Sequence, residues 1–268
     1  MNPLLFFRRL WPVRGLALKM IRRDIETRYR GSFLGVLWAF LNPLVMLLLY
    51  TLVFGVIMKA RWPGDPGAGI TGIAVSLFCG LIPYNVFAEC ATRGPGLVVA
   101  VPNYVKRVVF PLEVLPLVLV GSALFHGLVS FAVLLGVVLF ATGSLAWTVL
   151  LVPAVVFPML LLLLGLTFVL SSLGVFLRDL GQGMGLVTQV VLFGTPILYP
   201  RQALPGPLGA LVAVNPLAWT VENVRKVVLQ GKAPDWPGLL VWSAVTGLLM
   251  LAGYAWFMKT KRAFADVI

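Results

Sequence analysis

The residues that could carry chemistry are few in this chain, and their spacing does not assemble a catalytic centre. Of 268 residues, only one is histidine and nine are acidic. No two carboxylates are paired at a spacing suited to acid–base catalysis, and no histidine, cysteine and acidic residues cluster as metal ligands. No serine or cysteine stands in a nucleophile–base arrangement either. The sequence therefore predicts no catalytic residue and no metal site.

A nucleotide-binding loop is also missing from the sequence. No stretch has the spacing G-x-x-x-x-G-K-[ST], whose glycines and lysine hold the phosphates of ATP. The nearest candidate, Gly231-Lys232, has Lys226 in place of the first glycine. The chain is therefore expected to bind no cofactor itself.

Three ionisable side chains stand within or beside long apolar runs, where such groups are costly and usually paired or functional. We interpret His126, near the middle of an apolar stretch, as a packing histidine whose hydrogen bonds are satisfied. A hydrogen bond across a dimer, or exposure to a transport path, are the alternatives. Glu89 and Glu113 fall near the ends of apolar stretches, where water or Lys106 and Arg107 are expected to reach them.

The elements that must position these residues are membrane helices. The chain is 60% hydrophobic and 11% charged, with a mean hydropathy of +1.00. A soluble domain has about 25% charged residues. The composition therefore predicts a single all-α membrane domain.

Six apolar stretches approach the length of about 20 residues that a helix needs to cross a membrane. The predicted spans are 33–58, 71–91, 108–140, 147–177, 183–199 and 237–258. Within the segment at about 200–236, an apolar run of about a dozen residues is broken by Asn215-Pro216 and is too short to span. It predicts re-entrant or interfacial helices between spans five and six, on the outer side of the membrane.

The distribution of basic residues orients this layout. Fifteen of the 21 lysines and arginines fall on one side of the six spans and six on the other. Because the richer side is cytoplasmic, both termini are expected on the cytoplasmic side of the membrane. The positive charge is thus a topology signal, and we expect no nucleic-acid partner. The organisation is a cytoplasmic arm at 1–32, a membrane domain at 33–258 with a cytoplasmic loop at about 93–107, and a cytoplasmic tail at 259–268.

The arm contains an amphipathic helix that ends in DIETRYR, before a turn at Gly31-Ser32. Such a helix lies in the membrane plane with its basic face towards the headgroups. Asp24 and Glu26 precede Arg28 and Arg30 by four residues, which predicts two ion pairs along the helix. The helix is either a passive anchor or a cuff at the cytoplasmic entrance that receives a partner or an amphiphilic substrate. The candidate entrance residues are Arg23, Asp24, Arg28, Tyr29 and Arg30.

The junction between this helix and the first span carries a dense motif. It reads Arg28-Tyr29-Arg30-Gly31-Ser32, then Leu34-Gly35, Leu37-Trp38 and Leu41-Asn42-Pro43-Leu44. The string resembles the polysaccharide-export branch of ABC transporter permeases, and most closely the permeases for O-antigen and teichoic acid. Weaker similarities, such as Thr195-Pro196-Ile197-Leu198-Tyr199 and Asn215-Pro216-Leu217, extend the resemblance over nearly the whole chain.

The resemblance implies a mechanism and a set of partners. Two permeases form a homodimer around a translocation path, and each binds one cytoplasmic ATPase subunit that holds ATP and Mg. A lipid-linked glycan, O-antigen by preference, enters from the cytoplasmic leaflet. The alternatives are teichoic acid, capsule or another glycan, or a drug or lipid; a membrane-embedded enzyme or an assembly scaffold is the rival from another class.

The cytoplasmic loop at about 93–107 is, by the same resemblance, the contact with the ATPase and contains a short coupling helix. The alternative is an ordinary basic cytoplasmic loop. The candidate coupling residues are Arg93, Asn103, Tyr104, Lys106 and Arg107.

Aromatic residues on spans one and five are candidates for lining the path, because aromatic rings pack on the C–H faces of sugars without gripping one sequence. Anchoring in the lipid interface is the alternative. The candidates are Phe33, Trp38, Phe40, Tyr50, Phe54, Phe193 and Tyr199. At the start of span five, Gly181 and Gly185 form a G-x-x-x-G spacing, which predicts either a tight helix pair or a flexible loop.

Overall fold

The computed structural model describes residues 11–58, 70–106, 110–201, 204 and 206–268, and these residues form helices and turns without a strand. This confirms the predicted all-α membrane fold. The α-helices are α2 (Arg14–Tyr29), α3 (Trp38–Tyr50), α4 (Ile70–Arg93), α5 (Pro102–Lys106), α6 (Val114–Thr142), α7 (Val152–Phe176), α8 (Leu180–Phe193), α9 (Gly206–Ala213), α10 (Pro216–Leu229), α11 (Trp236–Thr260) and α12 (Phe264–Val267). Shorter 3-10 helices are η1 (Gly35–Leu37), η3 (Gly94–Gly96), η4 (Trp147–Leu151) and η6 (Lys261–Ala263), and η2 (Thr51–Ile57) is a π-helix.

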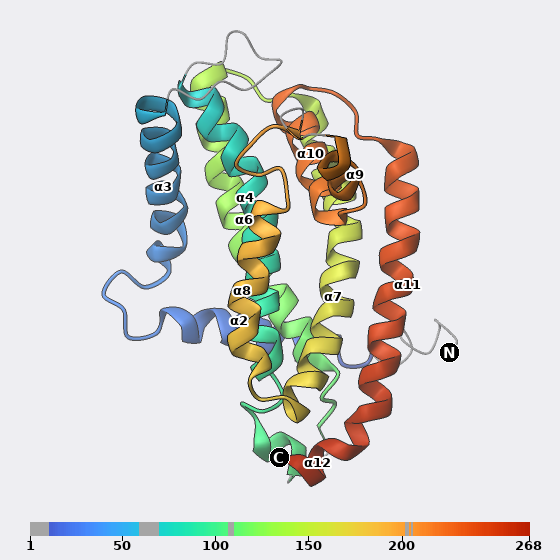
Figure 1. The fold of residues 1–268 in the computed structure, drawn as a ribbon. Helices are drawn as coiled ribbons and strands as arrows, with labels where there is room; N and C mark the ends of the chain where they lie inside the picture. Colours follow the sequence, from blue (N-terminus) through green and yellow to red (C-terminus); the bar gives the residue numbers. More distant parts are fainter. Residues whose placement is uncertain (1–10, 59–69, 107–109, 202–203, 205) are drawn as a thin grey trace.

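The long helices run side by side, with the short ones gathered at the two ends of the bundle (Figure 1). One end carries α2, α5 and α12, and we call it the lower end. The other carries α9 and α10, and we call it the upper end. Helix α2 lies across the bundle, whereas α3 stands at its margin.

Five helical segments of the described residues are long and apolar enough to cross a membrane: Gly35–Ile57, Gly72–Gly96, Val114–Thr142, Trp147–Phe176 and Trp236–Val267. The predicted fifth span corresponds to α8, which ends at Phe193 rather than at residue 199. Its 14 residues cover about 21 Å, less than the roughly 30 Å of a hydrocarbon core. Helix α8 nevertheless carries the chain from the lower end towards α9 and α10 (Figure 1).

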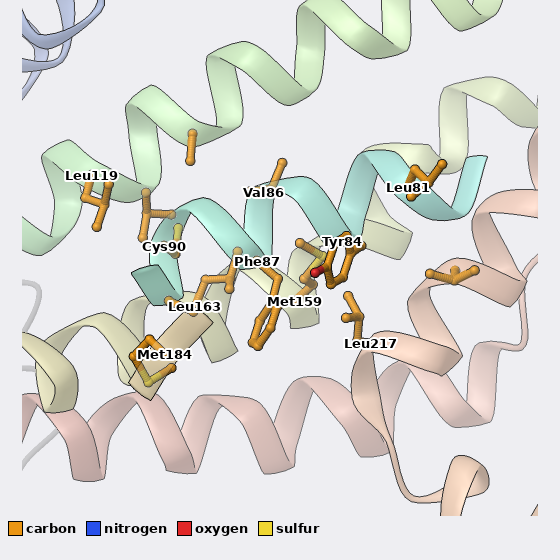
Figure 2. Close-up of a cluster of buried hydrophobic side chains, with 14 of the residues drawn as sticks. Leu81, Tyr84, Val86, Phe87, Cys90, Leu119, Met159, Leu163, Met184 and Leu217 are labelled. Atoms are coloured by element: carbon orange, nitrogen blue, oxygen red, sulfur yellow. The ribbon is translucent and has the colours of Figure 1, made fainter. Parts of the chain in front are cut away.

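Helix α4 is the central element of the bundle. Its segment Gly72–Gly96 is 78% buried, whereas Gly35–Ile57, which contains α3, is only 11% buried. Figure 2 shows the cluster around α4, into which α6, α7, α8 and α10 each send side chains. Its labelled members include Tyr84, Phe87 and Cys90 of α4, Leu119 of α6, Met159 and Leu163 of α7, Met184 of α8 and Leu217 of α10. This cluster fixes the depth at which each neighbour sits against α4.

Helices α7 and α11 approach each other closely enough for backbone contact. A Cβ atom added at Gly165 would lie 2.8 Å from the Cα atom of Met250, and one added at Gly253 would overlap the Gly165 carbonyl. Without side chains at these two positions the helices close into one unit. No local spacing in the sequence predicts that Gly165 and Gly253 meet.

Several helix boundaries follow from local chemistry. Asn215, predicted as a break, caps α10: its side-chain oxygen accepts hydrogen bonds from the N–H groups of Leu217 (2.9 Å) and Ala218 (3.4 Å). The predicted turn after the arm is present, and Gly31 has φ of 84°, a conformation that favours glycine. The third span begins at Val114 instead of residue 108, which leaves Pro111 outside the helix.

Candidate functional site: an ion-pair network and a pocket at the lower end

Helix α2 packs on protein through its apolar face. Ala17 is buried against Val114 and Val118 of α6. Ile21 sits over Gly121, where an added Cβ would overlap the isoleucine side chain. The apolar face of the amphipathic helix α2 therefore packs against α6, and this contact holds α2 at a fixed level across the bundle.

The charged residues of α2 reach the end of α4. Arg93 donates to both carboxylate oxygens of Asp24, at 2.8 and 3.0 Å. It also donates to Oε1 of Glu89 at 2.8 Å, and Arg28 donates to the same oxygen at 2.6 Å. Two helices are thus joined by a chain of four charges in which Glu89, largely buried, lies between two guanidinium groups.

His126 adds α6 to this network. Its Nδ1 atom lies 2.9 Å from Nη1 of Arg28 and 3.2 Å from Oε2 of Glu89. One nitrogen cannot accept from the arginine and donate to the carboxylate at once, so each tautomer makes one of the two bonds. Nε2 is buried and has no hydrogen-bond partner among the described residues. We interpreted His126 from the sequence as a packing histidine with satisfied hydrogen bonds. Among the described residues this is true of Nδ1 but not of Nε2.

The remaining predicted entrance residues lie around the same network. Tyr29 packs edge-on against His126, with 6.0 Å between ring centroids, and partial burial raises the pKa of its phenol. Arg23 is exposed beside Asp24, and Arg30 is exposed where α2 ends. The structure thus gathers Asp24, Arg28 and Tyr29 at one point and leaves Arg23 and Arg30 at its rim.

The ion pairs that the sequence predicted along α2 are wrong. Asp24 binds Arg93 of α4, and Glu26 binds Arg22 at 2.7 Å, in the opposite direction along the helix. Of the neighbours expected for Glu89 and Glu113, Lys106 binds neither carboxylate among the described residues, and Arg107 lies outside them. Glu89 binds the network, and Glu113 binds Lys261 at 2.6 Å. For Asp24 and Glu113, tertiary packing supplied a partner from a distant element, which helical spacing cannot reveal.

A pocket of about 850 Å³ opens beside the network, between α2, the α4–α5 connection and the start of α8. Three arginines and one aspartate line it, together with apolar side chains from α2 and α6. These lining residues are Arg23, Arg93, Arg178, Asp24, Met20, Leu115 and Val118. A site with this lining suits an anionic group attached to an apolar chain.

The predicted coupling loop begins one residue later than expected, because Arg93 is the last residue of α4. Backbone contact pins the start of the loop, since a Cβ at Gly174 of α7 would overlap the Pro95 carbonyl. A short helix does form, α5. It exposes Asn103 and Lys106, and it turns Tyr104 inward to stack on Phe110 with 4.6 Å between centroids. Arg107 lies outside the described residues.

The candidate path-lining aromatics fall into two groups. Phe33 is fully exposed, and Trp38, Phe40 and Phe193 are substantially exposed on the margins of α3 and α8. In contrast, Tyr50 packs against the central cluster, and Tyr199 donates its hydroxyl to the Phe193 carbonyl. Phe54 is half-buried beside Tyr50, with 6.3 Å between ring centroids.

Gly181 and Gly185, the predicted G-x-x-x-G pair, have open space at their Cβ positions. No tight contact forms there within the described chain. Gly181 instead borders the pocket.

The upper end is held by a residue that sequence reasoning counted only as an outer-side charge. Arg225 of α10 is 7% exposed. Its guanidinium donates to the carbonyl oxygens of Ser76 (2.9 Å), Pro196 (2.6 Å) and Ile197 (2.8 Å). These acceptors belong to α4 and to the turn after α8, where the chain leaves its helix and carbonyls lose their helical partners. The sequence did contain one signal: the proline within Thr195–Tyr199 interrupts a helix, and the carbonyl groups before such an interruption need partners from elsewhere.

Comparison with known proteins identifies relatives that are similar along almost the whole chain. The RfbA protein of Myxococcus xanthus, an "O-antigen export system permease protein", is 31% identical over 264 residues, which cover 97% of this chain and 98% of the relative. A protein of the same name from Klebsiella pneumoniae is 29% identical over 257 residues, covering 94% and 95%. The Escherichia coli polysialic acid transport protein KpsM is 25% identical over 257 residues, covering 90% and 92%. The family model for the ABC-2 type transporter matches residues 17–229, from α2 to the end of α10. The chain therefore belongs to the ABC-2 type transporter family.

Proposed function

We propose that the chain is the membrane subunit of an exporter for lipid-linked polysaccharide, with O-antigen as the favoured cargo. The observation that carries this proposal is the similarity to O-antigen export permeases along almost the full length of both proteins. Two copies form the translocation path, and each engages one copy of a separate ATPase subunit that holds ATP and Mg. In this proposal the lower end faces the cytoplasm of a cell with an inner membrane, and the charge distribution of the sequence puts both termini on that side.

The lower-end pocket supports an anionic lipid-linked substrate. Lipid carriers are joined to their glycans through phosphate, and the pocket offers Arg23, Arg93 and Arg178 against one carboxylate, Asp24. Arginine suits phosphate because its planar fork presents several donors at once. Met20 and Leu115 supply apolar surface for the first carbons of the lipid.

The ion-pair network supports an entrance role for α2 over that of a passive anchor. An anchor needs only an apolar face, whereas Asp24 and Arg28 are committed to α4 and α6. Any movement of α2 therefore acts directly on α4, whose end continues into the proposed coupling loop.

Capsule polysaccharide is the second candidate cargo, because the polysialic acid transport proteins are also similar along most of the chain. Their lower identity, 25% against 31%, favours O-antigen.

The proposal is tested by removing α2 from the chain in its native host. We expect a variant lacking residues 14–30 to insert in the membrane at normal levels, to abolish surface polysaccharide and to accumulate lipid-linked glycan inside the cell. Immunoblotting of membranes and glycan staining of intact and lysed cells measure the three quantities.

The double variant Arg22→Ala/Glu26→Ala is the matched control, because this pair is exposed and has no ion pair with another element among the described residues. It should export normally. Normal surface polysaccharide in a cell that lacks the whole chain would refute the proposed function, and normal export without residues 14–30 would refute the entrance role of α2.

A further inference from the structure

The last helix of the chain packs beneath the proposed coupling helix. After α11 the chain turns through η6, and α12 then lies against α5 and α7 at the lower end (Figure 1). Phe264, at the start of α12, is 0% exposed, although the helix has only four residues. A fully buried phenylalanine in so short a helix indicates that the side chain serves a contact.

The Phe264 ring completes an aromatic cluster. Its centroid lies 5.4 Å from that of Phe257 on α11 and 6.1 Å from that of Phe176 at the end of α7. The same cluster contains the inward-facing side chains of α5, Tyr104 and Val105. Side chains of α12 and α5 are thus joined in one apolar unit with the ends of α7 and α11.

Helix α5 cannot hold its own position. It has five residues, and isolated helices shorter than about 12 residues are marginal in water. Its location must come from packing, and the two residues that pack, Tyr104 and Val105, do so in the Phe264 cluster. The opposite side of α5, with Asn103 and Lys106, is exposed.

Polar contacts fix the turn from which α12 is presented. Lys261 donates to Oε2 of the buried Glu113 at 2.6 Å, which ties η6 to the start of α6. The hydroxyls of Ser172 and Thr260 lie 2.7 Å apart and tie α7 to the end of α11. Both contacts act across elements, so α12 is set by the bundle rather than by its own few residues.

We propose that α12 is a positioning element for ATPase coupling: Phe264 and the Lys261–Glu113 pair hold α5 so that Asn103 and Lys106 face the ATPase subunit. This inference rests on the proposed function, because it takes α5 as the contact with that subunit. Phe264 and Lys261 act through α5 and need not touch the partner.

The experiment co-expresses the tagged full-length chain with its ATPase subunit and measures two quantities on the purified membrane complex. These are the amount of ATPase retained and the rate of ATP hydrolysis per retained subunit. We expect Phe264→Ala to lower retention at least fivefold at equal permease yield, and Phe264→Leu to stay within twofold of the parent chain. Val267→Ala is the matched control on the same helix, since Val267 is 42% exposed, and it should change nothing.

The ion pair gives a second, independent arm in case Phe264→Ala does not fold. Lys261→Glu alone places two carboxylates together and should lower retention. The double variant Glu113→Lys/Lys261→Glu restores the attraction in reverse and should recover at least half of the parent retention. A loss that the double variant fails to recover would overturn the proposal.

Lys106→Glu separates failure of this inference from failure of the proposed function. If it abolishes retention while Phe264→Ala and Lys261→Glu leave both quantities unchanged, α5 docks without help from α12 and the inference is wrong. If the parent chain retains no ATPase, the proposed function itself is wrong.

Discussion

The lower and upper ends of the bundle are both held by arginine, in opposite ways. At the lower end Arg28 binds a carboxylate of α4, Arg93 binds one of α2 and one of its own helix, and both arginines remain partly exposed. At the upper end Arg225 is buried and binds backbone carbonyls of α4 and of the turn after α8. The first arrangement joins side chains to side chains, and the second joins a side chain to the main chain.

The difference bears on what each end can do. Side chains of an exposed ion pair can exchange partners or admit water and an anion, because each charge is solvated when it lets go. Carbonyls buried around Arg225 have no such alternative, so breaking those bonds leaves unpaired acceptors. The lower end is therefore built to respond to a ligand or partner, and the upper end to keep the shape of a broken span.

The largest effect is expected at Arg225. Replacing it with leucine leaves the buried carbonyls of Pro196 and Ile197 without this donor at about 1–3 kcal/mol each, so the free energy of unfolding should fall by roughly 2–6 kcal/mol. Thermal unfolding of the detergent-purified protein measures this. Lys226→Leu, on the same helix, is the control. An Arg225→Leu protein as stable as the control would remove the contrast between the two ends.

A smaller effect is expected at Glu89, the shared carboxylate of the lower end. Glu89→Ala leaves Arg28 and Arg93 without their common acceptor, but both side chains can turn to water. We expect a loss of about 2 kcal/mol, within the range for hydrogen bonds to charged groups. Glu26→Ala, which breaks only the exposed pair with Arg22, should cost under about 0.5 kcal/mol. Equal losses for the two variants, by the same melting measurement, would contradict a special place for Glu89.

A smaller effect than that at Glu89 is expected at Glu222, which binds Arg201 at 3.0 Å on the upper end. Arg201 is 45% exposed, so the pair resembles an ordinary surface salt bridge. Glu222→Gln should therefore change the free energy of unfolding by less than about 1 kcal/mol. A loss comparable to that of Arg225→Leu would show that the upper end also depends on ion pairs.

Much of the fold was predictable because membrane helices are specified by composition. Long runs without charge fixed the all-α class and the approximate positions of the spans. The fifth span was misjudged at its end because residues 194–199 remain apolar after the helix stops, and hydropathy does not distinguish a buried turn from a helix. Arg225 supplies the polar partners of that turn from 28 and 29 residues further along the chain.

For the candidate site, the sequence predicted several of the residues but not the contacts between them. Asp24, Arg28 and Arg93 were identified from the resemblance and from their charge, but Asp24 and Arg93 are 69 positions apart. His126 joined the network only because α6 packs against both α2 and α4. Local sequence spacing does not predict contacts of this kind, because they depend on how α2, α4 and α6 cross.

The isolation of α3 has a consequence for how the protein is made. Its segment Gly35–Ile57 is apolar on nearly all sides and draws little support from the rest of its own chain. A helix whose backbone is mostly paired internally is at home in lipid before any neighbour exists. During synthesis, α3 can therefore pass from the insertion machinery into the lipid by itself and anchor the nascent chain. The central helix α4, with its buried faces, must wait for α6 and α7.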